Sequence, residues 1–128
     1  MGMGLELYNT SQAAREVFQE ADDSLGINLS KLIFRGPDSR LKNTANSQPA
    51  IMTVSIAAWK AWKEQAGEDE VPPSMVAGHS LGEYTSMVVA GVTSFSDAVR
   101  LVRKRGQLMQ QASVKRPGGM AAIMGLDE

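Results

Sequence analysis

A serine placed between two glycines is the strongest chemical signal in this sequence. Gly78, Ser80 and Gly82 form a Gly-x-Ser-x-Gly pattern within "SMVAGHSLGEY". The pattern alone also occurs by chance in turns, but here an apolar run precedes it and a helical pattern follows it, which favours a nucleophile elbow. Such a serine sits on a strained turn between strand and helix, and the glycines remove side chains that would collide there. The backbone N–H of Leu81, at the helix start, is then a candidate oxyanion donor.

A serine nucleophile needs a base, and the sequence offers few candidates. His79 is the only histidine, but adjacent residues of a strand point to opposite faces, so its ring should face away from Ser80. Glu83 falls in the first turn of the expected helix, where a carboxylate ordinarily interacts with the helix dipole. We therefore expect no general base for Ser80 within these 128 residues.

Arg105 is the second candidate functional residue, because it interrupts an apolar helical stripe. The stripe consists of Ala98, Leu101, Val102, Leu108, Met109 and Ala112. The i, i+3, i+4 spacing puts Arg105 in its middle, where a buried guanidinium needs a charged or strongly accepting partner. A structural salt bridge and a clamp for a ligand carboxylate both satisfy that need. The pattern leaves the two alternatives equal.

The elements that must position these residues are mostly helical. Apolar periodicity, caps and breakers predict helices over 11–25, 49–66, 81–90 and 97–114, with two short helical turns around the Gly36-Pro37 break. The first helix has Thr10 or Ser11 as its expected cap and Gly26 just past its end, and its expected apolar stripe is Ala14, Val17, Phe18 and Ala21. Ser94 or Ser96 is the expected cap of the last helix. Two short strands are predicted, over 74–79, buried on both faces, and at the C-terminal end from 118. Because two strands cannot form a stable parallel sheet, the sheet requires further strands.

The composition describes an ordinary globular chain. Its net charge of −1 argues against nucleic acid or an anionic membrane surface as the main partner, and it has no cysteine. No stretch resembles a signal peptide or a membrane span, so a cytoplasmic location is expected. Nothing in the sequence predicts a metal site or a bound cofactor.

Four motifs together resemble the malonyl-CoA:acyl carrier protein transacylases of fatty acid synthesis. They are "GHSLGEY", the run "AGVTSFSDAVRLVRKRGQLMQ", the upstream "NSQPAIMTVSIA" and the final "GGMAAIMGL". The acyltransferase domains of polyketide synthases share them and are the alternative family assignment. A simple α/β serine hydrolase is a further alternative, but it offers no reason for an inward arginine.

The resemblance implies roles for five residues. Ser80 is the acylated nucleophile, the Leu81 N–H contributes to the oxyanion hole, and Arg105 binds the malonyl carboxylate. Gln48, in "QPA", and His79 lie near the substrate. The substrates implied are malonyl-CoA and phosphopantetheinylated acyl carrier protein, without a cofactor.

The resemblance also implies an incomplete enzyme. It predicts an α/β fold, a partial α/β-hydrolase-like acyltransferase core with helices around a short parallel sheet, truncated at both ends. Residues 1–117 belong to that domain, and 118–128 form the first strand of a truncated ferredoxin-like subdomain. The family's glycine-rich "GQGSQ" turn precedes Met1, and its catalytic histidine follows Glu128. We therefore expect an inactive fragment that self-associates through unpaired strand edges.

Overall fold

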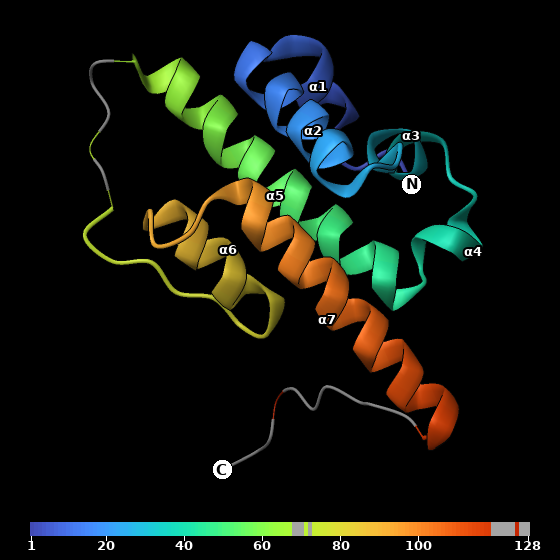
Figure 1. The fold of residues 1–128 in the computed structure, drawn as a ribbon. Coiled ribbons are helices and arrows are strands. Elements are labelled where there is room, and N and C mark those ends of the chain that lie inside the picture. The colour runs from blue at the N-terminus through green and yellow to red at the C-terminus, as the bar shows by residue number, and fades with distance from the viewer. Residues whose placement is uncertain (68–70, 72, 119–124, 126–128) are drawn as a thin grey trace.

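The computed structural model describes residues 1–67, 71, 73–118 and 125. The described residues form seven helices: α1 (Leu5–Thr10), α2 (Gln12–Leu25), α3 (Leu29–Arg35), α4 (Asp38–Leu41), α5 (Thr44–Ala66), α6 (Leu81–Val89) and α7 (Phe95–Lys115). The long helix α5 is central. Helices α1 to α3 lie on one side of it and α6 lies on the other, while α7 runs alongside α5 and also contacts α2 (Figure 1).

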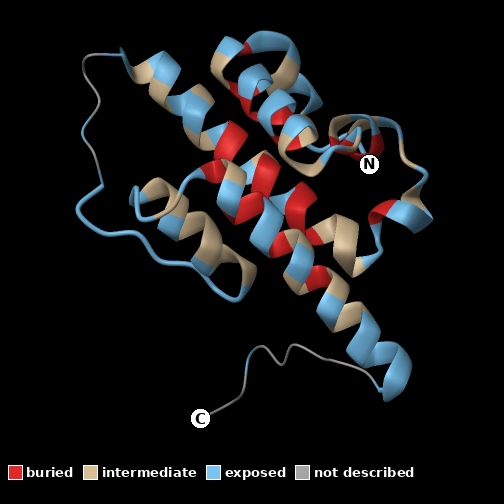
Figure 2. Ribbon diagram, in the orientation of Figure 1, coloured by how far each residue is buried: buried red, intermediate tan, exposed pale blue. Residues whose placement is uncertain are grey.

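The hydrophobic core lies where α2, α5 and α7 meet, and the buried residues concentrate there (Figure 2). Its largest fully buried side chains include Phe18 from α2, Met52 and Ile56 from α5, and Val99 and Val102 from α7. The outer ends of α5 and α7 are exposed. The core therefore fixes the middle of α5 against α7, and the candidate site residues of both helices lie close to this junction.

Helix α2 confirms the prediction made from its caps and apolar stripe. The Ser11 hydroxyl accepts a hydrogen bond from the Ala14 N–H at 3.0 Å, as an N-cap does. All four residues of the predicted stripe, Ala14, Val17, Phe18 and Ala21, are buried, and Gly26 ends the helix in the left-handed conformation. The two short helices on either side of Gly36-Pro37, α3 and α4, are confirmed as well.

The predicted start of α5 is wrong. The helix begins at Thr44, with the Asn43 side chain as its cap, so Pro49 lies inside the helix rather than in its first turn. A proline has no N–H to give the carbonyl four residues earlier, which here belongs to Ala45. The Arg103 guanidinium, reaching from α7, takes the place of that donor at 3.4 Å. The helix therefore starts five residues earlier than its sequence pattern predicts, and Arg103 contacts both the Ala45 carbonyl and, at 2.9 Å, the Asn46 side chain in its first turns.

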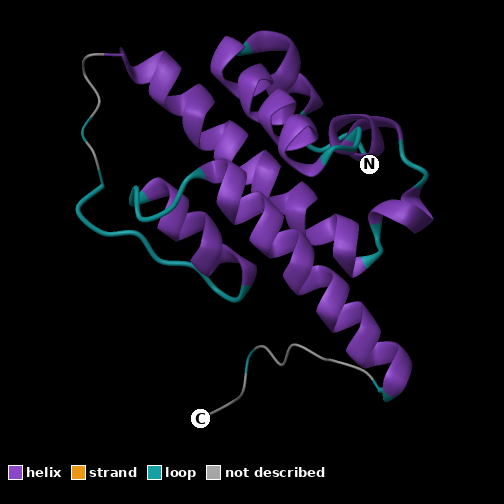
Figure 3. Ribbon diagram, in the orientation of Figure 1, coloured by secondary structure: helices purple, strands orange, loops and turns teal. Residues whose placement is uncertain are grey.

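The predicted sheet is not confirmed, because the described residues contain no strand (Figure 3). Residues 74–79 form an exposed connection, so the predicted burial on both faces is wrong, and the Met75 side chain is 90% exposed. An extended segment becomes a strand only when a neighbour accepts and donates its backbone hydrogen bonds. No described segment lies there to do so. Most of the second predicted strand, 118–128, falls outside the described residues.

Candidate active site

The backbone at Ser80 has the strained turn that a nucleophile elbow requires. Ser80 has φ 56° and ψ −104°, and no other non-glycine residue in the described part of the chain has a positive φ. A side chain held in this region costs about 1 to 3 kcal/mol. The connection 74–79 ends here and α6 begins at the next residue, so Ser80 stands at the helix N-terminus.

Only one of the two flanking glycines is explained by close packing. A Cβ on Gly78 would lie 2.0 Å from the carbonyl carbon of Gly82, so the incoming chain passes directly against the first turn of α6. A Cβ on Gly82 would meet nothing within 4 Å. The expectation that both glycines prevent a collision therefore holds for Gly78 alone within the described residues.

The N-terminus of α6 leaves one backbone donor beside Ser80. The Gly82 N–H donates to the His79 carbonyl at 2.9 Å, and the Glu83 N–H donates to the Ser80 carbonyl at 3.4 Å. The Leu81 N–H has no acceptor among the residues that the structure describes. A free N–H directly after a serine nucleophile is the arrangement that stabilises a developing oxyanion.

Arg105 reaches Ser80 across 25 positions of sequence. Its Nη2 donates to Ser80 Oγ at 3.0 Å, and its Nη1 donates to Gln48 Oε1 at 2.5 Å. The guanidinium also lies over the Tyr84 ring, 5.7 Å from the centroid, within the range of a cation–π contact. Arg105 on α7 thus directly contacts two other residues singled out from the sequence, Gln48 on α5 and Ser80 at the start of α6.

The position of Arg105 on α7 differs from the predicted one. The buried stripe consists of Phe95, Ala98, Val99, Val102 and Gly106, whereas Leu101 and Leu108 are half exposed and Ala112 is exposed. Arg105 lies at the border of this stripe and is partly accessible. Within the described part of the chain it makes no ion pair, and its partners are the neutral Gln48 and Ser80. No structural salt bridge occupies it there, and its charge remains available to an anion.

The Gln48 side chain is buried, and both ends of its amide make hydrogen bonds. It is 6% exposed, and its Nε2 donates to the Met109 sulfur at 3.1 Å. Sequence reasoning missed Met109, which it assigned to the apolar stripe, and missed Tyr84 altogether. Both lie four residues after a functional residue on the same helix face, Tyr84 after Ser80 and Met109 after Arg105. That spacing was the available signal.

His79 gives no sign of acting as the base. Its side chain is exposed, and in the described structure only its backbone carbonyl takes part in a hydrogen bond. The side-chain partner that the structure gives Ser80 Oγ is Arg105, which can only donate a proton. The described groups around Ser80 are therefore a serine hydroxyl, a free backbone N–H and a cation, and none of them accepts a proton from the hydroxyl.

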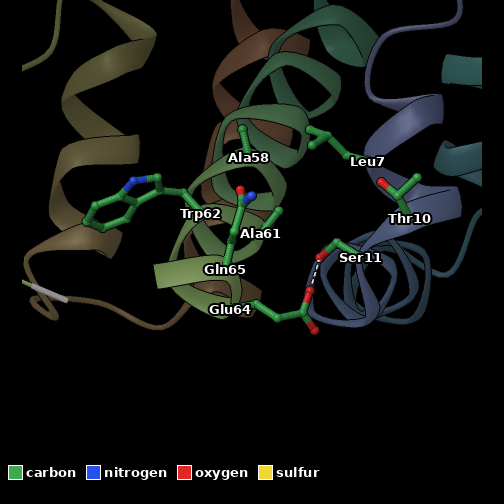
Figure 4. A pocket seen from close by; sticks show the side chains of 8 residues that line it. All are labelled: Leu7, Thr10, Ser11, Ala58, Ala61, Trp62, Glu64 and Gln65. Carbon is green, nitrogen blue, oxygen red and sulfur yellow. Dashed lines mark hydrogen bonds between the residues drawn. The ribbon is translucent and has the colours of Figure 1, made fainter. Parts of the chain in front are cut away.

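Two clefts of the described surface are lined by neither Ser80 nor Arg105. The cleft in Figure 4 lies between the C-terminal half of α5 and the junction of α1 with α2, and Glu64 and Ser11 hydrogen-bond at its edge. A shallow groove beside α6 is lined in part by Val76, Ala77 and Gly82. None of the helices in the described segments is long and apolar enough to cross a membrane.

Comparison with known proteins points to one family. The model of the acyl transferase domain matches residues 1–127. The malonyl CoA-acyl carrier protein transacylase of Bacillus subtilis is 49% identical over 127 residues, which are 99% of this chain and 39% of that protein. A solved acyl carrier protein S-malonyltransferase from Vibrio cholerae aligns with a TM-score of 0.81 at 41% identity, covering 88% of this chain and 36% of that one.

A further solved structure is a complex. It holds a type II PKS acyl-carrier protein with its malonyl-transacylase and aligns with a TM-score of 0.80 at 44% identity, covering 88% of this chain and 35% of that one. The chain therefore spans well under half the length of the proteins it matches.

Proposed function

This chain belongs to the acyl transferase domain family, and we propose that it provides the nucleophile and the carboxylate-binding arginine of a malonyl transferase that acts on acyl carrier protein. The observation that carries the proposal is the direct contact between Ser80 Oγ and Arg105 Nη2, 3.0 Å apart. It puts a cation within reach of a group attached to the serine. An acyl chain that ends in a carboxylate fits that arrangement.

The proposed reaction has two halves. Ser80 Oγ attacks the thioester carbonyl of malonyl-CoA, its proton passes to a base, and the C–S bond breaks to release coenzyme A, which takes up a proton. The thiol of the carrier protein's phosphopantetheine then attacks the serine ester, the C–O bond breaks, and Ser80 recovers its proton. The Leu81 N–H donates to the carbonyl oxygen while it carries negative charge in both halves.

Arg105 selects the acyl group in this proposal. The malonyl group has a free carboxylate, which accepts two hydrogen bonds from a guanidinium. In the described structure, Arg105 Nη2 donates to Ser80, and we propose that it turns to the substrate carboxylate once the malonyl group is bound. An acetyl group makes no such contact and therefore gains nothing from Arg105.

The base lies outside the described surroundings of Ser80. General-base catalysis contributes about 10²- to 10⁴-fold. We therefore propose that a polypeptide limited to residues 1–128 transfers malonyl groups slower than the full-length protein that contains this chain, by a factor in that range.

Replacement of Arg105 in the full-length protein tests the proposal. We expect Arg105→Ala to lower kcat/KM for malonyl-CoA about 10- to 100-fold, the loss of one charge-assisted contact, and to leave acetyl transfer within a few-fold. Arg105→Lys should restore part of the malonyl transfer, because an ammonium cannot make the paired contact. Lys104→Ala removes one exposed charge from the same helix and is the matched control.

Three results would contradict the proposal. Equal losses for both acyl groups with Arg105→Ala would return this arginine to a structural role. A malonyl adduct that persists in Ser80→Ala, observed by intact-protein mass spectrometry, would place the nucleophile elsewhere. Ester hydrolysis without any dependence on carrier protein would favour a hydrolase instead.

A further inference from the structure

Arg105 is held in place by a side chain that has no direct contact with Ser80. Gln48 Oε1 accepts from Arg105 Nη1 at 2.5 Å, while Arg105 Nη2 contacts Ser80. The Gln48 side chain is almost fully buried, at 6% exposure. A buried acceptor on the neighbouring helix α5 thus fixes one arm of the guanidinium and leaves the other arm directed at the nucleophile.

Met109 determines which way the Gln48 amide faces. The Gln48 NH₂ group donates to the Met109 sulfur at 3.1 Å, and a thioether can accept but cannot donate. If the amide were turned over, its oxygen would face the Met109 sulfur, which has no proton to donate, and its NH₂ group would face the donors of the guanidinium. Met109 therefore keeps the amide oxygen on the Arg105 side.

A neutral acceptor at this position has a consequence that an acidic one would not have. An amide oxygen fixes the guanidinium without neutralising its charge, so the full charge remains for an incoming anion. A carboxylate here would form an ion pair with Arg105 and compete with the carboxylate of the substrate. In the described residues no acidic side chain takes this place.

We propose that Gln48 is a positioning residue for Arg105, oriented by Met109, and that it sets the preference for acyl groups that carry a carboxylate. Gln48 binds Nη1, so Nη2 and Nε remain for the substrate. This assigns Gln48 an action through Arg105 instead of direct contact with the substrate. The inference rests on the proposed malonyl transfer.

Gln48→Glu in the full-length protein is the decisive variant, because it keeps the shape of the side chain and adds one charge. We expect kcat/KM for malonyl-CoA to fall about 10- to 100-fold, mainly through KM, and acetyl-CoA to change by less than about threefold. Gln65→Glu makes the same change at an exposed position of the same helix. It should leave the ratio of kcat/KM for malonyl-CoA to kcat/KM for acetyl-CoA unaltered. Gln48→Met removes the acceptor at similar volume and should lower the ratio by a smaller factor, as should Met109→Leu.

The outcomes separate this inference from the proposed function. If the unaltered protein transfers malonyl groups and Gln48→Glu retains their preference over acetyl groups, the inference is wrong and the proposed function stands. Gln48→Glu could instead lose malonyl and acetyl transfer equally. Gln48→Met then decides: if circular dichroism shows that it is folded and it keeps the wild-type ratio of malonyl to acetyl kcat/KM, the inference is wrong. If the unaltered protein transfers no malonyl group, the proposed function fails and the inference falls with it.

Discussion

Replacing Gly106 by alanine should separate the two helices that build the site. A Cβ at this position would lie 2.5 Å from the Thr44 carbonyl oxygen and 2.8 Å from Ala45 Cα, both backbone atoms of α5. Such atoms cannot rotate aside as the end of a flexible side chain can. To bring the new methyl group to an ordinary contact distance, α7 must move about 1 Å away from the first turn of α5.

Two opposing terms set the magnitude. Alanine is favoured over glycine within a helix by about 1 kcal/mol, whereas overpacking a close contact costs about 1 to 3 kcal/mol, and rigid backbone atoms place this case at the upper end. The net loss is about 1 to 2 kcal/mol. For a chain of this size it lowers Tm by roughly 4 to 10 °C.

The substitution should lower the rate of malonyl transfer by more than the loss of folding free energy alone would explain. Gly106 is adjacent to Arg105, so a 1 Å displacement of α7 lengthens the hydrogen bond to Gln48, which is 2.5 Å long. Misplacement on this scale can cost about 10²-fold in rate. We expect malonyl transfer by the full-length protein to fall by that order at a temperature where the variant is still folded.

A matched glycine makes the assay decisive. Gly82 also lies in a helix, but a Cβ there would meet nothing within 4 Å. In thermal unfolding of the 128-residue chain, Gly82→Ala should therefore be neutral or stabilising by up to about 1 kcal/mol. If Gly106→Ala were as stable as Gly82→Ala, the close approach of α7 to α5 would not be what requires glycine at 106, and the reasoning would be refuted.

Three further predictions concern strain, acid and the proline in α5. Ser80→Gly should abolish the acyl adduct yet raise the urea-unfolding free energy by about 1 kcal/mol, since glycine accepts φ 56° without strain; an unchanged free energy would mean that the turn is unstrained. Hydrogen bonds from the Ser11 hydroxyl and a backbone N–H lower the pKa of Glu64, so its stabilising effect is present above the unfolded-state value of about 4.3 and is lost as pH falls through the lower folded-state pKa. The difference in urea midpoint between the wild type and Glu64→Gln should therefore shrink from pH 6 to about pH 3, and a constant difference would count against this role. Arg103→Met should cost about 1 kcal/mol, because it removes the donor that replaces the missing proline N–H at the Ala45 carbonyl; an equal cost in a Pro49→Ala background would exclude that explanation.

The parts of the fold that sequence predicted are those fixed by local chemistry. The caps at Ser11 and Ser94 are decided within a few residues of chain, and each is one of the two positions that its pattern offered. The stop at Gly26 lies where its pattern indicated. The elbow is local in the same sense, because its strain is imposed by the turn between Gly78 and α6. Residue spacing alone did not predict that Arg105 lies beside Ser80, whereas the family resemblance implied it.

The parts that sequence mispredicted depend on groups distant in the chain. The helix α5 starts at Thr44, five residues before Pro49, and Arg103, more than fifty positions away, donates to the Ala45 carbonyl that Pro49 leaves without an N–H donor. The segment 74–79 has the composition of a buried strand, but composition cannot supply the neighbour that pairs with its backbone. Met109 was assigned to an apolar stripe because a sulfur that accepts from an amide leaves no trace in a hydrophobic pattern.

The two halves of the candidate site are supported in different ways, and this bears on how the site works. Arg105 and Gln48 lie on long helices whose middle sections form the core, so their mutual geometry is set by packing between α5 and α7. Ser80 follows an exposed connection and is restrained chiefly where Gly78 passes against α6. Its hydrogen bond to Arg105 therefore connects the less supported serine to the rigid pair of Arg105 and Gln48. In the proposed function, a substrate carboxylate that draws Arg105 away also ends the hydrogen bond from Arg105 to the Ser80 oxygen, so that carboxylate binding and the release of that oxygen occur together.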